Sequence, residues 1–129
     1  MAKWLSQAWL DEQRRLGADQ PERPGASARL QYVVKGDRGE PDVSYYWVLD
    51  DGKLVESRLG TLDDSDLTLT MTRADAEALQ RGDLDEQAAY MQGKIKAEGN
   101  MATLMSLLPI TGSPEYRELQ AKLRSATEF

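Results

Sequence analysis

Two residue types that carry much of protein chemistry are missing from this chain, which has no cysteine and no histidine. Without cysteine there is no disulfide, no thiolate nucleophile and no cysteine ligand for a metal. Without histidine the commonest general base is missing, and so is the one side chain that normally titrates near neutral pH. Ser-His-Asp and Cys-His catalysis are therefore excluded, and we expect no metal site and no cofactor.

Long apolar runs and an excess of basic residues are missing as well. No run approaches the ~20 apolar residues of a membrane-spanning helix, and the N-terminus lacks the pattern of a signal peptide. The net charge of -6 disfavours nucleic acid as a partner, because binding to phosphates depends on clustered Lys and Arg. We therefore expect a cytoplasmic protein, with residues 1–129 forming a single domain.

Alternation of apolar and polar residues predicts the strands, and helical periodicity with capping residues predicts the helices. The expected strands cover residues 30–34, 43–49, 53–59, 67–71 and 93–98, with a hairpin turn at Asp51-Gly52. The expected helices are residues 2–17, a helix from the Thr72 cap to Gln80, a short one after Asp85, one after Asn100 and one after Ser113-Pro114. This order indicates an α+β domain in which helices cover a five-stranded, mainly antiparallel sheet.

The junction at Gly99-Asn100 joins a strand pattern to a helix pattern. Glycine can adopt backbone angles that other residues avoid, and asparagine is a preferred helix N-cap. The residues that follow at i, i+3, i+4 and i+7 are Met101, Leu104, Met105 and Leu108. Such a stripe is by itself typical of ordinary core packing, although methionines can repack around ligands of different shape.

Residues 91–101, in which a Lys-Ile-Lys strand runs into Gly-Asn-Met, resemble the signature of the sterol carrier protein family, and the resemblance extends upstream through residues 65–72. It implies an apolar tunnel lined partly by the helix after Asn100. It also implies a non-catalytic carrier of a fatty acid, acyl-coenzyme A or sterol-like lipid, with no catalytic residues. The expected ligand-binding residues are Tyr45, Trp47, Leu69 and Met71 from the sheet, Met101, Leu104, Met105 and Leu108 from the helix, Tyr90 and Met91 at the mouth, and Leu119 and Leu123 from the last helix.

Two other classes of function stay open from the residues alone. The same apolar surfaces would serve a structural or dimerisation module, and the sequence leaves open both a homodimer and transient membrane contact. An enzyme built on Asp, Glu, Lys or Tyr would need a strongly shifted pKa in a cleft.

If binding is purely apolar, affinity for an uncharged sterol should be nearly constant between about pH 6 and 8, because no unperturbed side chain of this chain titrates there.

Overall fold

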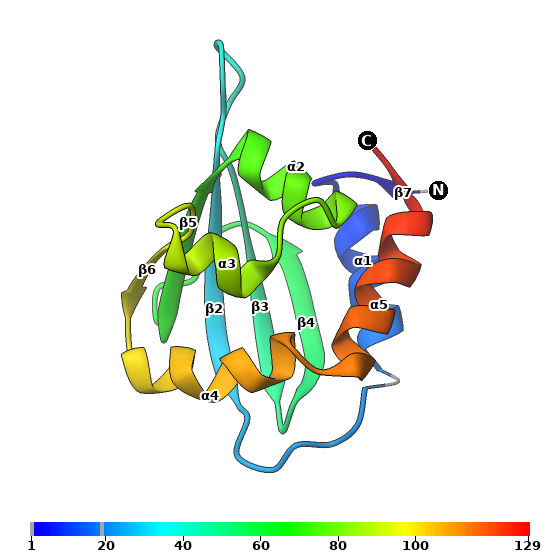
Figure 1. Cartoon of the computed structure of the whole chain (residues 1–129), viewed down its shortest axis with the longest axis vertical. Helices are drawn as coiled ribbons and strands as arrows, with labels where there is room; N and C mark the ends of the chain where they lie inside the picture. The colour runs from blue at the N-terminus through cyan, green and yellow to red at the C-terminus, as the bar shows by residue number, and fades with distance from the viewer. Residues whose placement is uncertain (1, 19) are drawn as a thin grey trace.

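The computed structural model describes residues 2–18 and 20–129, and its centre is a five-stranded sheet (Figure 1). The strands are β2 (Ala28–Lys35), β3 (Val43–Asp50), β4 (Lys53–Leu59), β5 (Leu67–Thr72) and β6 (Lys96–Gly99). They lie in the order β4-β3-β2-β5-β6. The pair β2 and β5 is parallel and the other neighbours are antiparallel. The predicted α+β fold with a mainly antiparallel sheet is therefore confirmed.

Five helices pack around this sheet, and two short strands join the ends of the described chain. The helices are α1 (Gln7–Gly17), α2 (Arg73–Arg81), α3 (Glu86–Met91), α4 (Met101–Thr111) and α5 (Pro114–Ser125). The short strands β1 (Ala2–Lys3) and β7 (Thr127–Glu128) pair in parallel, so the first and last segments lie side by side next to α1 and α5 (Figure 1).

Two predicted starts, those of the first helix and of the last strand of the sheet, differ most from the structure. The helix expected to start at residue 2 begins at Gln7, because residues 2 and 3 pair with β7 and the Ser6 hydroxyl accepts a hydrogen bond from the Trp9 N–H at 3.2 Å. The strand expected from residue 93 begins at Lys96. Gly93 has a φ of 76° and its N–H donates to the Tyr90 carbonyl at 3.1 Å, so this segment closes α3 before the strand starts.

Strand alternation determines which side chains meet the helices. The inward positions of β2 and β5 form two apolar clusters with helical residues. One cluster contains Val34 together with Leu10 of α1 and Leu123 of α5. The other contains Leu67 together with Leu104 of α4. The helices are thus seated on one face of the sheet, and the hollow spaces of the fold lie along that interface.

The Gly99-Asn100 junction has the predicted geometry. Gly99 has a φ of 125°, and a Cβ added there would lie 2.5 Å from the Asp66 carbonyl oxygen. The same oxygen accepts a hydrogen bond from the Asn100 N–H at 2.8 Å. The Asn100 side chain caps α4 by accepting hydrogen bonds from the N–H groups of Ala102 and Thr103. Both the backbone angle and the close approach therefore require glycine at this position.

Replacing Gly99 with alanine is expected to lower the free energy of unfolding by about 2 to 3 kcal/mol, because the added Cβ meets backbone and the φ angle is strained. Gly93→Ala is the matched control, since Gly93 also has a positive φ but nothing lies within 4 Å of the added Cβ. We expect Gly93→Ala to lower the free energy of unfolding by only about 1 kcal/mol. Urea denaturation measures both, and equal losses would show that close packing at the junction contributes nothing.

Candidate functional site

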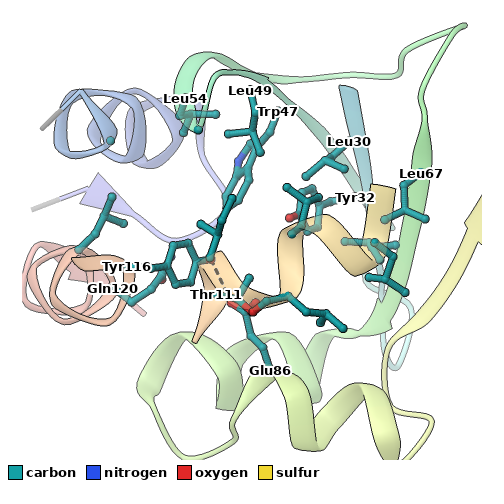
Figure 2. A pocket seen from close by; sticks show the side chains of 18 of the residues that line it. Leu30, Tyr32, Trp47, Leu49, Leu54, Leu67, Glu86, Thr111, Tyr116 and Gln120 are labelled. Atoms are coloured by element: carbon teal, nitrogen blue, oxygen red, sulfur yellow. Dashed lines mark hydrogen bonds between the residues drawn. The ribbon is translucent and has the colours of Figure 1, made fainter. Parts of the chain in front are cut away.

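A cavity of about 110 Å³ lies, within residues 2–18 and 20–129, between the inner face of the sheet and helices α3, α4 and α5. Figure 2 shows the side chains of Leu30, Tyr32 and Trp47 entering this space from the strands, and those of Glu86 and Tyr116 entering from the helices. Apolar side chains make up most of the lining. It is therefore an environment suited to an apolar ligand.

A second cavity, of about 80 Å³, lies next to the first under α1 and α2. Trp9 and Met71 are among its own lining residues. The residues that line both cavities are Gln13, Tyr32, Trp47, Leu69, Glu86, Ile95, Tyr116 and Gln120. A shared wall of side chains thus separates two adjacent cavities, of which the second has the more polar lining.

Aromatic rings from two neighbouring strands pack together beside the cavities, with Tyr32 and Trp47 in the shared wall and Tyr45 in the lining of the second cavity. Tyr32 stacks on Tyr45 with ring centroids 4.8 Å apart, and it lies 4.9 Å from the tilted ring of Trp47. The Trp47 indole N–H donates to Gln13 Oε1 at 3.1 Å, which anchors the ring to α1. Alternation places these three side chains on the inner face, because Tyr32 pairs with Tyr45 and Leu30 pairs with Trp47.

One charged side chain projects into this apolar space. Glu86 lies in the first turn of α3, and its Oε1 accepts a hydrogen bond from the Tyr116 hydroxyl of α5 at 3.1 Å (Figure 2). Burial raises the pKa of Glu86 to about 7, an effect that the hydrogen bond from Tyr116 partly offsets and that the charge of Asp85 reinforces. Burial, with the negative charge of Glu86, also raises the pKa of Tyr116 well above its ordinary value.

Sequence reasoning missed Glu86 because an acidic residue just after the Asp85 cap resembles a surface residue that favours the start of a helix. A signal was nevertheless present. Glu86 shares the i, i+3, i+4 face of α3 with the fully buried Ala89 and the half-buried Tyr90. No unperturbed side chain of this chain titrates between pH 6 and 8, but burial raises the pKa of this carboxyl into that range.

The structure brings most of the predicted site residues to the two cavities. Those that line at least one of them are Tyr45, Trp47, Leu69, Met71, Tyr90, Leu104, Leu108 and Leu119. Their role in ligand binding stays a prediction. The lining residues of α4 are Leu104, Leu107, Leu108, Ile110 and Thr111, and all except Ile110 follow the spacing i, i+3, i+4, i+7.

Four predicted residues lie elsewhere, contrary to their expected place in the lining. Met91, Met101 and Met105 are on the surface, with exposed fractions of 85%, 41% and 62%. The inward stripe of α4 is rotated relative to the predicted one, which places Met101 and Met105 at its outer side. Leu123 is fully buried and packs in the cluster with Leu10 and Val34, outside both cavities.

Over residues 2–18 and 20–129, no group of three or more acidic side chains is arranged to hold a metal ion. None of the helices in these two ranges has the length and apolar character needed to cross a membrane.

A model described as the SCP-2 sterol transfer family matches residues 10–111. The chain belongs to this family. Among curated proteins, sterol carrier protein 2 of Rattus norvegicus is 35% identical over 92 residues, which cover 68% of this chain and 16% of the relative. The chain thus matches about a sixth of the length of this SCP-2 relative.

Solved structures of sterol carrier proteins share the fold of this SCP-2 family member. A crystal structure of sterol carrier protein 2 superposes with a TM-score of 0.71 at 19% identity, covering 94% of this chain and 97% of that chain. A solution structure of palmitated SCP2L2 from Aedes aegypti has a TM-score of 0.62 at 21% identity, covering 80% of this chain and 89% of that one. The sterol-carrier-like architecture predicted from residues 91–101 is therefore confirmed.

Proposed function

We propose that this protein binds and carries a lipid, of the fatty acyl, acyl-coenzyme A or sterol-like kind, in a tunnel formed by joining its two cavities. The observation that carries the proposal is the apolar cavity between the sheet and α4, which adjoins a second cavity across a shared wall. Membership of a sterol transfer family supports lipid binding. The palmitated relative from Aedes aegypti supports an acyl chain as one kind of guest for this fold.

The proposed binding residues come from nearly the whole described chain. Lining residues extend from Trp4, before α1, to Gln120 on α5. This supports the prediction that residues 1–129 act as one lipid-binding domain.

The expected binding energy allows the lipid to be bound reversibly. About fifteen buried methylenes at ~0.8 kcal/mol each give a gross gain of roughly 12 kcal/mol. Subtracting about 4 kcal/mol for lost freedom leaves roughly 8, which corresponds to about micromolar affinity.

A long lipid requires more space than the two cavities now provide, since an apolar cavity of about 150 Å³ holds only a molecule the size of benzene. Helix α4 is the element best suited to move. Pro109 inside α4 has no N–H to donate to the Met105 carbonyl, so one helical hydrogen bond is missing. We therefore assign opening of the tunnel to displacement of α4 from the sheet.

Carriage is favoured over catalysis by the chemistry of the lining. Glu86 is a carboxyl with a raised pKa in a cavity, which is one feature of an active site. Its hydrogen-bond partner is a tyrosine, and the described lining of the two cavities holds neither a second carboxylate nor a lysine or arginine. The raised pKa of Tyr116 keeps its hydroxyl protonated, so it is a poor base and a poor nucleophile, and the pair fits ligand recognition better than bond cleavage.

Filling the larger cavity tests the proposal. Leu108→Trp places bulk inside the lining, whereas Met105→Trp adds the same side chain on the outer side of α4. We expect Leu108→Trp to weaken binding of 1-dodecanol at least tenfold, about 1.4 kcal/mol, and Met105→Trp to change it less than twofold. Equilibrium dialysis with radiolabelled 1-dodecanol measures both without relying on tryptophan fluorescence.

A structural module is the competing function, and it predicts the opposite outcome. Protein purified without detergent would then carry no lipid in native mass spectrometry, and neither tryptophan variant would alter 1-dodecanol binding, because there would be none. Either a co-purified lipid that Leu108→Trp removes, or a selective loss of 1-dodecanol affinity in that variant, supports the carrier.

A further inference from the structure

Glu86 is the only charged side chain in the described lining of either cavity, and it lies in the wall that both cavities share. The other lining side chains are apolar, aromatic or neutral polar groups. A ligand that fills the joined tunnel must therefore pass this carboxyl. In a low-dielectric space the interaction of one charge with a ligand head group is much stronger than it would be in water.

The hydrogen bonding of Glu86 determines what it can accept. Tyr116 donates to Oε1, and Oε2 has no partner among the described residues. An ionised carboxylate only accepts hydrogen bonds, so its free oxygen is complemented by a donor. In this buried position the free Oε2 of Glu86 is therefore best paired with a hydroxyl or an ammonium group of the ligand. A second carboxylate placed there would be repelled, and the lining supplies no lysine or arginine to neutralise it.

We propose that Glu86 makes the tunnel selective for apolar ligands whose polar group donates a hydrogen bond, an alcohol or an amine, over fatty-acid anions of the same length. This selectivity rests on the proposed lipid-binding function and narrows its ligand class. Tyr116 holds the carboxyl in place and leaves one oxygen facing the ligand. The apolar side chains of the lining contribute affinity through contact with the hydrocarbon part of the ligand.

The groups that face Glu86 act on its pKa in both directions, because the charge of Asp85 raises it and the hydrogen bond from Tyr116 lowers it. Asp85 precedes it on the same turn, Tyr116 reaches it from α5, and the Tyr32 and Tyr45 hydroxyls approach from β2 and β3. With a pKa of about 7, Glu86 changes from mostly protonated to mostly ionised between pH 6 and 8. A fatty-acid anion then requires a proton to be taken up on binding, whereas an ammonium requires the ionised carboxylate. The two ligands should respond to pH in opposite directions.

Three ligands with the same twelve-carbon chain test this selectivity: laurate, 1-dodecanol and dodecylamine. Neither laurate nor dodecylammonium changes charge appreciably between pH 6 and 8, since simple carboxyls titrate near 4 to 5 and alkylamines near 10. From pH 6 to pH 8 we expect laurate affinity to fall about tenfold and dodecylamine affinity to rise about tenfold. The affinity for 1-dodecanol should change less than twofold. Equilibrium dialysis at constant ionic strength gives all three.

Two variants assign the pH response to one carboxyl. Glu86→Gln should abolish both slopes and improve laurate binding at pH 8. Asp85→Asn, an equal charge change at an exposed N-cap, should retain both slopes but move them to lower pH, because it removes a charge that raises the pKa of Glu86. If 1-dodecanol binds but the three ligands respond alike to pH and to Glu86→Gln, the selectivity is wrong and the carrier function stands. If none of the three ligands binds the parent protein, both are wrong.

Discussion

Replacing Glu86 with glutamine is expected to raise the free energy of unfolding at pH 8 by about 3 kcal/mol. The carboxyl has an ordinary pKa of 4.5 and a folded-state pKa of about 7, and each tenfold change in proton affinity corresponds to about 1.36 kcal/mol. Glutamine has nearly the same shape and its amide oxygen can still accept the Tyr116 hydroxyl. The variant therefore removes the cost of a buried charge while leaving the neighbouring contacts in place.

The pH dependence follows from the direction in which folding moves the pKa. Because folding raises the pKa, the folded state holds this proton more tightly than the unfolded state does. The contribution of Glu86 is complete below about pH 4.5, falls as the pH rises through about 7, and stays lost above it. The difference in stability between Glu86→Gln and the parent should grow across that window and level off near pH 8.

Urea denaturation of the parent, Glu86→Gln and Asp85→Asn at several pH values between 5 and 8 measures this difference. Subtracting the parent at each pH cancels the titration of the other carboxylates. Asp85→Asn retains an N-cap and is expected to show a much smaller gain. A parallel offset at all pH values would show that Glu86 titrates as an ordinary exposed carboxyl, and would weaken the case for its role in the tunnel.

Strand alternation and capping residues were enough to predict the sheet and most helix starts. Tyr45 and Trp47 face the cavities because alternate residues of β3 face the same side, and Asn100 caps α4 as expected. The boundaries that failed depend on distant partners. Residues 2 and 3 form a strand only because β7 lies beside them, which no local pattern near the N-terminus indicates.

The candidate site was only partly predictable, for two physical reasons. Helix α4 has apolar residues on most of its circumference, so periodicity alone does not tell which side faces the sheet; the methionine side at Met101 and Met105 is exposed. The Glu86–Tyr116 pair joins two helices 30 residues apart in the chain, a tertiary contact that sequence patterning does not reveal. A charge kept in an apolar lining at a cost in stability is typical of a functional position.

The substitution Leu123→Ala is expected to lower the free energy of unfolding by about 3 kcal/mol and to leave ligand affinity unchanged. Leu123 is fully buried on α5 and packs with Leu10 and Val34, so truncation leaves a cavity in closely packed surroundings. Leu119→Ala is the matched control one turn earlier on the same helix. Leu119 already borders the larger cavity, so Leu119→Ala should lower the free energy of unfolding by less, about 2 kcal/mol.

Chemical denaturation gives the two stabilities, and dialysis with radiolabelled 1-dodecanol under conditions where both variants stay folded gives the affinities. For Leu123→Ala we expect an affinity within twofold of the parent, because its side chain lies outside both cavities. A tenfold loss of affinity in the folded variant would instead place Leu123 in the ligand-bound tunnel, as the sequence alone predicted. That result would require α5, or the side chains of Trp9 and Met71 that lie between its cluster and the second cavity, to move when ligand binds, because Leu123 is fully buried in the present structure.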